Sequence, residues 1–413
     1  MKGEKKILVL TDAFMPPAYV PRVRTLCDVL VQKGWKVKVL TEDVQGVRPQ
    51  FSHTYSIHSV PYYKCEGVMG KIEWVVKFIL NLFCDHKGRY FTCQWNKLLR
   101  NEEFDYVFCS SFQTFPLTVA ARLAQQRGVP LHVDLRDMAE QCGGHQYNSH
   151  KGVRGSSLYE WINAIYGRRN VRRRNEVLKC AQSLSSVSPW HVQQLKELND
   201  NVALIYNGYD QRLFFPQDVK TNAFKIIYTG MIYGKQMQDP TLLFQALHNM
   251  LRVNELPQEL ECHFYVKPEV RKCLENYATE WKLTNYLYYH DYVSPQEIPA
   301  LLHEASVVLV FSNKTVPGGP NGIMTTKFYE ALGVEKPVLC VRSDEAHLAQ
   351  LIHETNAGVS ATTVDEVEEF IRTKYDEWKS KGYTHQNVNV EEKNKYSRQQ
   401  QAIQFIECLN HIG

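Results

Sequence analysis

The sequence predicts an α/β protein built from two doubly wound domains, each with a parallel sheet. Short apolar segments rich in β-branched residues alternate with amphipathic helical segments, which is the pattern of repeated βαβ units. This alternation forms two series that meet near residue 210, and 413 residues are more than one ordinary hydrophobic core supports. We therefore expect one domain over 1–208 and another over 209–392, with a helix in 393–413 that packs back on the first.

The first series begins with a clear strand–helix–strand unit. Strands are expected at 6–11, 36–41, 106–110, 131–135, 184–187 and 202–206, and helices at 22–33, at 116–127 and from 189. Gly34 is placed as the C-cap of the first helix, and Ser188 before Pro189 is placed as the N-cap of the third. Ligands of such sheets bind beyond the carboxyl ends of the strands, so residues that directly follow strands are the functional candidates.

The second series repeats the pattern. Strands are expected at 224–229, 261–266, 287–290, 307–311 and 337–341, and helices from 239, from 294 and at 325–332. Ser294 and Glu297 have the spacing of a capping box at the start of the helix from 294. Gly333 is placed to end the helix at 325–332. The segment Gln399–Leu409 carries apolar residues at helical spacing, so it has an apolar stripe to bury.

Composition narrows the class of protein. A formal net charge of +4 lacks the strong basic bias of general nucleic-acid binders, so we expect no nucleic-acid partner. No apolar segment is long enough to span a bilayer, and the N-terminal apolar run is too short for a signal peptide. The 11 cysteines form no Cys-x-x-Cys pair and the 15 histidines show no metal-binding spacing. We expect a cytoplasmic protein with free thiols, no metal site and no resident cofactor.

A glycine-rich loop runs from a strand into a helix at 316–330. Backbone N–H groups and the positive helix end favour a phosphate there, beside Asn321, Gly322 and Ile323. Lys327 adds positive charge in the first turn. The carboxylate of Glu330, about one turn further on, can accept hydrogen bonds from two ribose hydroxyls. An ordinary turn before an ordinary helix is an equally open interpretation.

Three more charged residues stand shortly after strands. Lys235 comes after the strand at 224–229, at a place where a lysine can offset charge on a departing diphosphate. Arg136 and Asp137 come after the strand at 131–135. A solvated loop lysine and a local ion pair are the simpler alternatives. The loop at 12–21 contains no glycine, which argues against a dinucleotide fingerprint in the first domain.

Two segments raise the question of membrane contact. Ile72–Phe83 is too short to span a bilayer, but its apolar width suits a helix that lies in the membrane interface. Arg168–Arg174 contains five arginines that can meet anionic head groups. We favour a core helix for the first segment. For the second segment, membrane contact and a solvated helix face both stay open.

Short motifs in both halves carry a resemblance to a known family. They are Ile7–Asp12 with Phe14–Pro17, Asp134–Asp137, Ser186–Pro189, Ile205–Asp210, Tyr228–Gly230, and Lys327–Gly333 with Lys336–Val338. In this order and spacing they resemble the retaining glycosyltransferases of family 4, which have the GT-B fold of two Rossmann-like domains facing a cleft. The Asp134–Asp137 motif is similar to the branch that includes aminosugar transferases acting on lipid-linked acceptors.

The resemblance implies transfer of a sugar from a nucleotide-sugar donor to a glycan or lipid-linked acceptor. It implies retention at the anomeric carbon, no metal, and a setting in cell-surface polysaccharide biosynthesis, with peripheral contact at the inner face of the membrane. Glu330 matches the glutamate that holds the ribose, and Lys235 lies near the lysine that binds the diphosphate. Gly230 would let the diphosphate approach the backbone. The first domain, with Arg136 and Asp137, would serve the acceptor side and catalysis.

The chain departs from the family pattern at several positions. The first glutamate of the family motif corresponds to Gly322, and Met231 stands where an arginine is usual. Ala18–Pro21 replaces a glycine pair in the N-terminal loop. Two other functions therefore stay open: a nucleotide-sugar epimerase of the same fold, and a protein that binds sugar nucleotides without catalysis.

Overall fold

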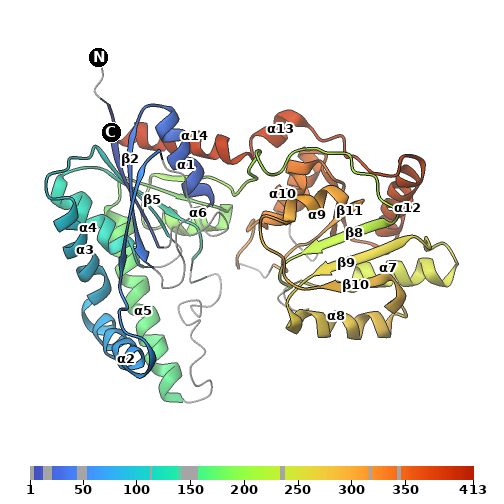
Figure 1. The fold of residues 1–413 in the computed structure, drawn as a ribbon, viewed down its shortest axis with the longest axis horizontal. Helices are drawn as coiled ribbons and strands as arrows, with labels where there is room; N and C mark the ends of the chain where they lie inside the picture. Colours follow the sequence, from blue (N-terminus) through green and yellow to red (C-terminus); the bar gives the residue numbers. More distant parts are fainter. Residues whose placement is uncertain are drawn as a thin grey trace. The chain divides into compact units, whose positions relative to one another are not determined.

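The protein folds into two compact units, each a parallel sheet covered by helices (Figure 1). The computed structural model describes residues 4–12, 21–43, 54–111, 114–138, 140, 157–232, 238–315, 319–341 and 346–413. Unit 1 comprises Met1–Tyr206 with Gln401–Gly413, and unit 2 comprises Asn207–Gln400. The fold class predicted from the sequence, two doubly wound parallel sheets, is confirmed.

The described part of unit 1 contains a seven-stranded parallel sheet in the order β3-β2-β1-β4-β5-β6-β7. Its strands are β1 (Lys6–Thr11), β2 (Lys36–Asp43), β3 (Ser56–Pro61), β4 (Tyr106–Ser111), β5 (Leu131–Leu135), β6 (Ser183–Ser186) and β7 (Val202–Leu204). Its helices are α1 (Pro21–Gln32), α2 (Gly67–Cys84), α3 (His86–Leu98), α4 (Leu117–Arg127), α5 (Ser157–Cys180), α6 (Pro189–Lys196) and α14 (Arg398–Ile412).

Alternating residues of the central strands of unit 1 enter two separate apolar cores. Leu8 of β1 and Val107 of β4 pack with α3 and α4 on one face of the sheet. Val9 and Phe108 pack with α1 on the other face, together with Phe405 of α14. The C-terminal helix therefore returns to complete the core of unit 1, as its apolar stripe predicts.

The described part of unit 2 contains a six-stranded parallel sheet in the order β10-β9-β8-β11-β12-β13. Its strands are β8 (Phe224–Thr229), β9 (Leu260–Tyr265), β10 (Leu287–His290), β11 (Val307–Phe311), β12 (Val338–Val341) and β13 (Gly358–Ala361). Its helices are α7 (Thr241–Arg252), α8 (Pro268–Glu280), the 3-10 helix Thr284–Tyr286, α9 (Ile298–Glu304), α10 (Thr326–Val334), α11 (Ala346–Glu354), α12 (Val364–Lys381) and α13 (Val390–Asn394). Residues of α7, α8 and α12 join the main apolar core of this unit.

The C-terminal segment that leads back to unit 1 belongs to unit 2 as far as residue 400. The backbone N–H of Tyr209 donates to the carbonyl of Tyr396 at 3.1 Å, and the N–H of Arg398 donates to the carbonyl of Tyr209 at 2.9 Å. These hydrogen bonds hold the segment at Tyr209 beside the segment at 396–398. The unit boundaries consequently fall at 206/207 and 400/401, where the sequence analysis placed 208/209 and 392/393.

Three local expectations need correction. The helix α10 runs through Gly333 and ends at Val334, with Glu335 as its left-handed C-cap at φ 56°. Residues 294–297 form a turn and α9 begins only at Ile298, although the Glu297 carboxylate accepts the backbone N–H of Ser294 at 2.9 Å. The core-helix interpretation of Ile72–Phe83 is wrong: this segment lies in α2, a helix with no buried residue. Its apolar period fits a core helix and an interfacial helix equally well, which is why sequence alone misplaced it.

The basic segment Arg168–Arg174 lies in α5 and has two environments. Arg168, Arg169 and Arg172 are exposed, whereas Arg174 is buried and forms hydrogen bonds of 2.8 and 2.5 Å with the two carboxylate oxygens of Glu140. The buried guanidinium is therefore structural, because a charge with so little solvent requires an ionic partner. Arg174 is therefore not available to an external ligand, whereas Arg168, Arg169 and Arg172 are exposed.

Candidate functional site

The sheet of unit 2 has its topological switch point between β8 and β11. From β8 the chain order runs outward through β9 and β10 on one side, and through β11, β12 and β13 on the other. In a doubly wound sheet the crevice for a ligand lies at such a point, beyond the carboxyl ends of the strands. Gly230 directly follows β8 there, and α10 begins after the loop that follows β11.

Lys327 reaches from the first turn of α10 to the end of β8. A Cβ atom added to Gly230 would lie 2.6 Å from Cε and 2.9 Å from Nζ of Lys327, so the lysine side chain rests directly against the glycine backbone. Gly230 also has φ +117°, a conformation that other residues rarely adopt. The Lys327 ammonium lies 5.5 Å from the ring centre of Tyr228. Burial lowers the pKa of Lys327, and the charge of Glu330 opposes that shift.

The start of α10 supplies backbone donors beside this lysine. Thr325 is the N-cap, and its hydroxyl accepts the backbone N–H of Lys327 at 3.4 Å. The first turn of any helix leaves further N–H groups without partners inside the helix, and the helix dipole makes this end positive. A phosphate placed here would meet N–H donors and an ammonium group together.

Glu330 lies on the same face of α10 as Lys327, three residues further on. The residue as a whole is half-buried, and burial of its carboxyl group raises the pKa of Glu330 to about 7. The positive charges of Arg398 and Lys327 act in the opposite direction. Glu330 is therefore a carboxyl group whose protonation changes near neutral pH, in a site that also contains a lysine and a helix N-terminus.

The loop before α10 shows why glycine stands at position 322. Gly322 is buried and has φ +64°, so it occupies the left-handed region that glycine adopts without strain. Asn321 beside it is exposed and Ile323 is half-buried. Residues 316–318 of this loop and Lys235 lie outside the described residues. The structure thus places Gly230, Lys327 and Glu330 together, with Asn321–Ile323 in the loop that leads to them.

In unit 1, Arg136 and Asp137 follow β5, as the sequence predicts. The guanidinium of Arg136 donates to both carboxylate oxygens of Asp12, at 2.8 and 3.0 Å. Asp12 directly follows β1, so the pair joins two strand ends at the carboxyl edge of the sheet. Both side chains are about 15% exposed or less, and Asp137 is half-buried. Arg136 thus forms an ion pair with a residue of the first strand–helix loop, which the sequence did not predict. Residues 13–20 of that loop lie outside the described residues.

A buried polar network lies under this edge of the sheet, and it was not predicted from the sequence. Asp134 of β5 is fully buried and pairs with Arg22 of α1 at 2.9 Å. Its carboxylate also accepts hydrogen bonds from Ser110 at 2.8 Å and Ser185 at 3.0 Å. Such a charge is tolerated because every neighbour offers a donor. An aspartate inside a short, mainly apolar strand of a parallel sheet is the local sign that predicts a network of this kind.

The described residues contain neither a metal-binding cluster nor a membrane-spanning helix. No group of three or more His, Cys, Asp or Glu side chains in the described ranges is arranged to hold a metal ion. No helix in that part of the chain combines the length and apolar character that crossing a membrane requires.

Comparison with known proteins identifies the fold. No known family profile matches the sequence, and no curated protein does. A sucrose-phosphate synthase from Thermosynechococcus elongatus is similar in structure over 98% of this chain and 99% of its own, with a TM-score of 0.63 at 13% identity. Anabaena Alr3699/HepE, solved with UDP and glucose, is similar over 99% and 100%, with a TM-score of 0.61 at 14% identity. The lipopolysaccharide outer core galactosyltransferase WaaB is similar over 98% and 99%, with a TM-score of 0.56 at 10% identity. The chain therefore has the GT-B fold, with two Rossmann-like units.

Proposed function

We propose that the protein is a glycosyltransferase that uses a nucleotide-sugar donor bound in unit 2. One observation carries the proposal: Lys327 lies against the backbone of Gly230 at the end of the central strand β8, with Glu330 one turn further along α10. This arrangement combines a cation, helix N–H donors and a carboxylate at the switch point of a doubly wound sheet. A diphosphate and the ribose attached to it need those three groups.

The donor is held by groups that suit its charges. Its diphosphate lies between the Gly230 backbone, the N-terminus of α10 and the ammonium of Lys327, while Glu330 accepts the two ribose hydroxyls. Lys235 is proposed as a second cation for the departing phosphate. As the bond from the anomeric carbon to the phosphate oxygen breaks, the acceptor hydroxyl forms its bond on the same face. The hydroxyl proton passes to the leaving diphosphate, so the sugar is transferred with retention and without a metal.

The acceptor is assigned to unit 1. Arg136 and Asp137 lie at the carboxyl edge of its sheet, and Arg136 is fixed by Asp12. A glycan or lipid-linked acceptor in cell-surface polysaccharide biosynthesis is the proposed class. The GT-B fold shared with a lipopolysaccharide galactosyltransferase supports this acceptor class. The fold shared with a protein solved with UDP and glucose supports the nucleotide-sugar donor. The cytoplasmic face of a membrane is the corresponding proposed location.

Calorimetric titration with UDP, GDP and ADP tests the donor site. We expect one of these nucleotides to bind and Lys327→Ala to weaken it at least about tenfold, because a charge-assisted contact to phosphate is lost. The matched control is Lys272→Ala, an exposed lysine of α8 in the same unit, which should leave the affinity unchanged. Equal affinities of the Lys327→Ala and wild-type proteins would remove the phosphate site from α10.

Incubation with a panel of nucleotide sugars tests the reaction itself. Transfer to an added acceptor supports the proposal, an epimerised donor would make the protein an epimerase, and binding without turnover would make it a non-catalytic binder. In the first case Lys235→Ala and Glu330→Ala should each reduce transfer at least about tenfold, which is roughly 1.4 kcal/mol of barrier. Full activity of both variants would show that the site assignment is wrong.

A further inference from the structure

Helix α2 places its polar side against unit 1 and leaves its apolar side in solvent. Glu73, Lys77 and Asn81 recur at four-residue spacing and form one stripe along the helix. The Glu73 carboxylate accepts the backbone N–H of Lys64 at 2.9 Å and pairs with the Lys77 ammonium at 2.6 Å. The Asn81 amide donates to the Tyr62 hydroxyl at 3.2 Å. This is the reverse of a helix that packs an apolar stripe on a water-soluble core.

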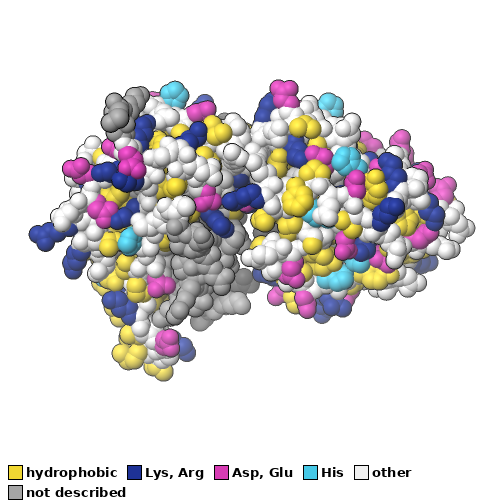
Figure 2. Space-filling model, turned by 45° about the horizontal axis from the view of Figure 1, so that its top comes forward, with side chains coloured by type: hydrophobic (Ala, Val, Ile, Leu, Met, Phe, Trp, Pro, Cys, Tyr) yellow, Lys and Arg dark blue, Asp and Glu magenta, His cyan; other side chains and the backbone are white. Residues whose placement is uncertain are grey.

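The solvent side of α2 is a continuous apolar surface about 27 Å long, since α2 has 18 residues at about 1.5 Å each. Eight of its apolar side chains are between 37% and 74% exposed: Val68, Met69, Ile72, Val75, Val76, Ile79, Leu80 and Phe83. Figure 2 shows the hydrophobic side chains gathered at this end of unit 1, at the lower left. A contiguous patch of this kind marks a binding surface, because isolated exposed apolar residues are normal but grouped ones are not.

The helix is held firmly in this orientation. Trp74 stacks on Phe78 with ring centres 5.4 Å apart, and Phe78 packs on Tyr166 of α5 at 5.1 Å. The guanidinium of Arg169, also on α5, donates to the carbonyl of Leu82 at 2.7 Å. That contact places a cation at the negative end of the α2 dipole. Contacts to α5 therefore fix α2 from one side while its outer side stays open.

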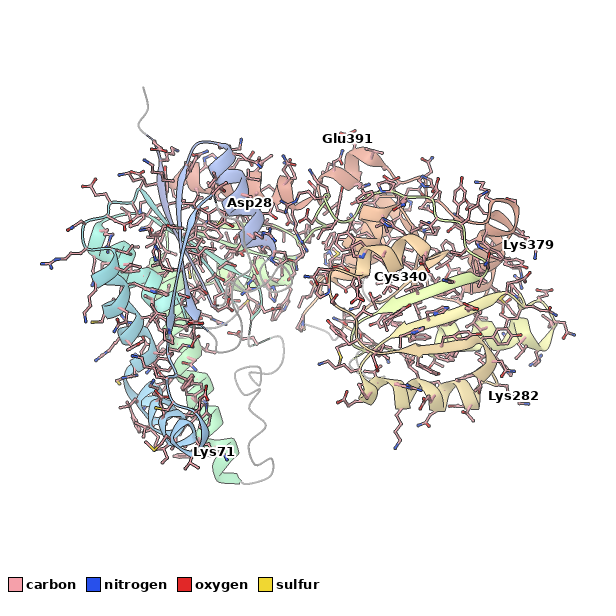
Figure 3. The ribbon with its side chains drawn as sticks, viewed as in Figure 1. Asp28, Lys71, Lys282, Cys340, Lys379 and Glu391 are labelled. Carbon is pink, nitrogen blue, oxygen red and sulfur yellow. The ribbon has the colours of Figure 1, made fainter. Side chains whose placement is uncertain are left out.

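Positive charges border the apolar surface. Lys71 is exposed in the second turn of α2 (Figure 3). Arg168 is exposed in the middle of α5, next to Arg169, which contacts the last turn of α2. Arg89 of α3 is exposed as well. None of these three forms an ion pair with any residue in the described ranges. Trp161 is 62% exposed and stands seven residues before Arg168, so both lie on the same side of α5.

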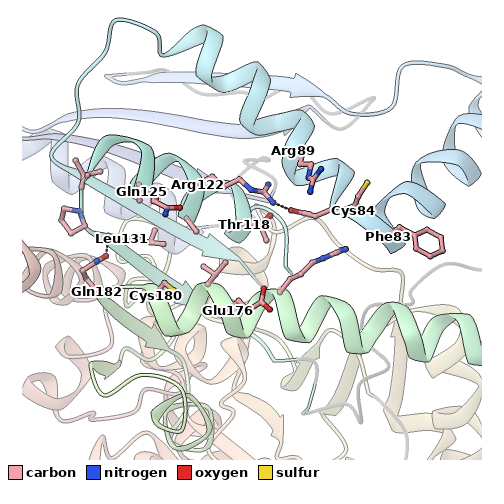
Figure 4. A pocket seen from close by; sticks show the side chains of 18 residues that line it. Phe83, Cys84, Arg89, Thr118, Arg122, Gln125, Leu131, Glu176, Cys180 and Gln182 are labelled. Atoms are coloured by element: carbon pink, nitrogen blue, oxygen red, sulfur yellow. Dashed lines mark hydrogen bonds and ion pairs between the residues drawn. The ribbon is translucent and has the colours of Figure 1, made fainter.

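A hollow of about 860 Å³ opens beside the end of α2 and has the same charge bias (Figure 4). Phe83 of α2 lines it, together with Arg89, Arg122 and Arg173, and its acidic lining residues are Asp85 and Glu176. Asp85 pairs with Arg122 at 2.5 Å. The hollow thus suits an anionic group next to an apolar one, which is the chemistry of a lipid head group above its acyl chains.

We propose that α2 lies in the surface of an anionic membrane, with its apolar side among the upper acyl chains. Lys71, Arg89 and Arg168 then meet the head-group phosphates. A helix of 18 residues that contains three charged side chains lies on the bilayer and does not cross it. The inference goes beyond the proposed sugar transfer and does not depend on it, because it concerns a surface of unit 1 alone.

Sedimentation of the full-length protein with lipid vesicles tests the apolar part of the surface. We expect binding to vesicles of phosphatidylcholine with about one-third phosphatidylglycerol, and at least about tenfold weaker binding of Ile72→Ser/Val76→Ser. The control is Val253→Ser/Val390→Ser, which changes two valines of similar exposure in unit 2 and should bind as wild type does. Undiminished binding of the Ile72→Ser/Val76→Ser protein would overturn the proposal.

A charge variant tests the electrostatic part. Lys71→Gln/Arg168→Gln should weaken binding to the anionic vesicles about tenfold or more, and added salt should reduce the wild-type affinity towards the same level. Lys267→Gln/Lys272→Gln, two exposed lysines of unit 2, is the matched control. Pure phosphatidylcholine vesicles should bind the wild type and the charge variant equally weakly.

Light scattering and nucleotide titration distinguish membrane binding from self-association and from a defect in the donor site. If α2 were a contact between protein copies, the protein without lipid would be a dimer that Ile72→Ser/Val76→Ser dissociates, and vesicles would not bind it; that result would overturn the proposal. Both α2 variants should keep the nucleotide affinity of the wild type. Loss of vesicle binding with intact nucleotide binding distinguishes a failure at α2 from a failure of the proposed donor site.

Discussion

At the scale of single residues, Glu330 is an acid in surroundings that oppose its charge. Burial raises its pKa to about 7, and the nearby Lys327 and Arg398 only partly offset this effect. A carboxylate that accepts two ribose hydroxyls has to be ionised, because a protonated carboxyl group has lost one acceptor site. The proposed site therefore keeps an ionisable group at some expense of stability until a ligand supplies the missing donors.

The raised pKa of Glu330 predicts how the free energy of unfolding depends on pH. The pKa of Glu330 in the folded protein is about 7, above its ordinary value of 4.5, so its effect on stability is absent below about pH 4.5. Between about pH 4.5 and 7 the unfolded state releases this proton while the folded state still holds it, so the folded state progressively loses up to about 3 kcal/mol, and the loss is complete above pH 7. Glu330→Gln should consequently be more stable than the wild type by about 3 kcal/mol at pH 8.5 and by only about 1 kcal/mol at pH 5.5, as measured by urea unfolding.

The control for this measurement is Glu369→Gln, which changes an exposed glutamate of α12 in the same unit. Its difference from the wild type should be small and the same at both pH values. A constant advantage of Glu330→Gln at pH 5.5 and 8.5 would mean that the amide improves packing and that the Glu330 charge has no part in the effect.

The sequence predicts the members of the candidate site better than their contacts. The order of strand, glycine-rich loop and helix identifies Gly230, Lys327 and Glu330 as residues at strand and helix ends, and the structure brings them together. The partner of Arg136 could not be predicted in the same way. Asp12 lies 124 positions away, and no local pattern specifies which distant side chain meets a guanidinium. Pairings of this kind follow from strand order, which a single sequence leaves open.

At the scale of elements, burial decides which ones the sequence reveals. The central strands β1, β4, β5, β8 and β11 are almost entirely buried and mainly apolar, and they were predicted within one or two residues. Of the edge strands, β3 and β13 are mostly half-buried and were not predicted, because their polar or small residues carry no such signature, whereas β7 and β10 were predicted. The long helix α5 was missed because its polar sequence has almost no apolar period.

The N-cap of α6 is an element signal that the sequence predicts and the structure confirms. The hydroxyl of Ser188 accepts the backbone N–H of His191 at 3.1 Å, and Ser188 is fully buried. Ser188→Ala should lower the free energy of unfolding of unit 1 by about 1 kcal/mol, since a buried N–H loses its acceptor. Chemical denaturation measures this change. Ser188→Thr, which keeps the hydroxyl, should recover most of the loss, and an equal loss in both variants would point to packing.

At the scale of the whole molecule, the two units have separate apolar cores. Phe405 of α14 packs in the core of unit 1 against Phe108, with ring centres 5.3 Å apart, although the chain reaches it only after all of unit 2. Tyr228 lies in the core of unit 2. Each unit therefore depends for its stability on its own side chains, and a ligand bound within one unit should act on that unit alone.

Separate cores predict separate unfolding transitions. Phe405→Ala removes a buried ring and should destabilise unit 1 by about 3–5 kcal/mol, which lowers one thermal transition and leaves the other in place. The nucleoside diphosphate that binds best, at about 100 times its Kd, should raise only the second transition, by about 2.7 kcal/mol of stability. Scanning calorimetry of the wild type and of Phe405→Ala, each with and without nucleotide, checks both assignments. If the nucleotide raises the same transition that Phe405→Ala lowers, the donor is bound in unit 1, and the site at Gly230 and Lys327 is not its binding site.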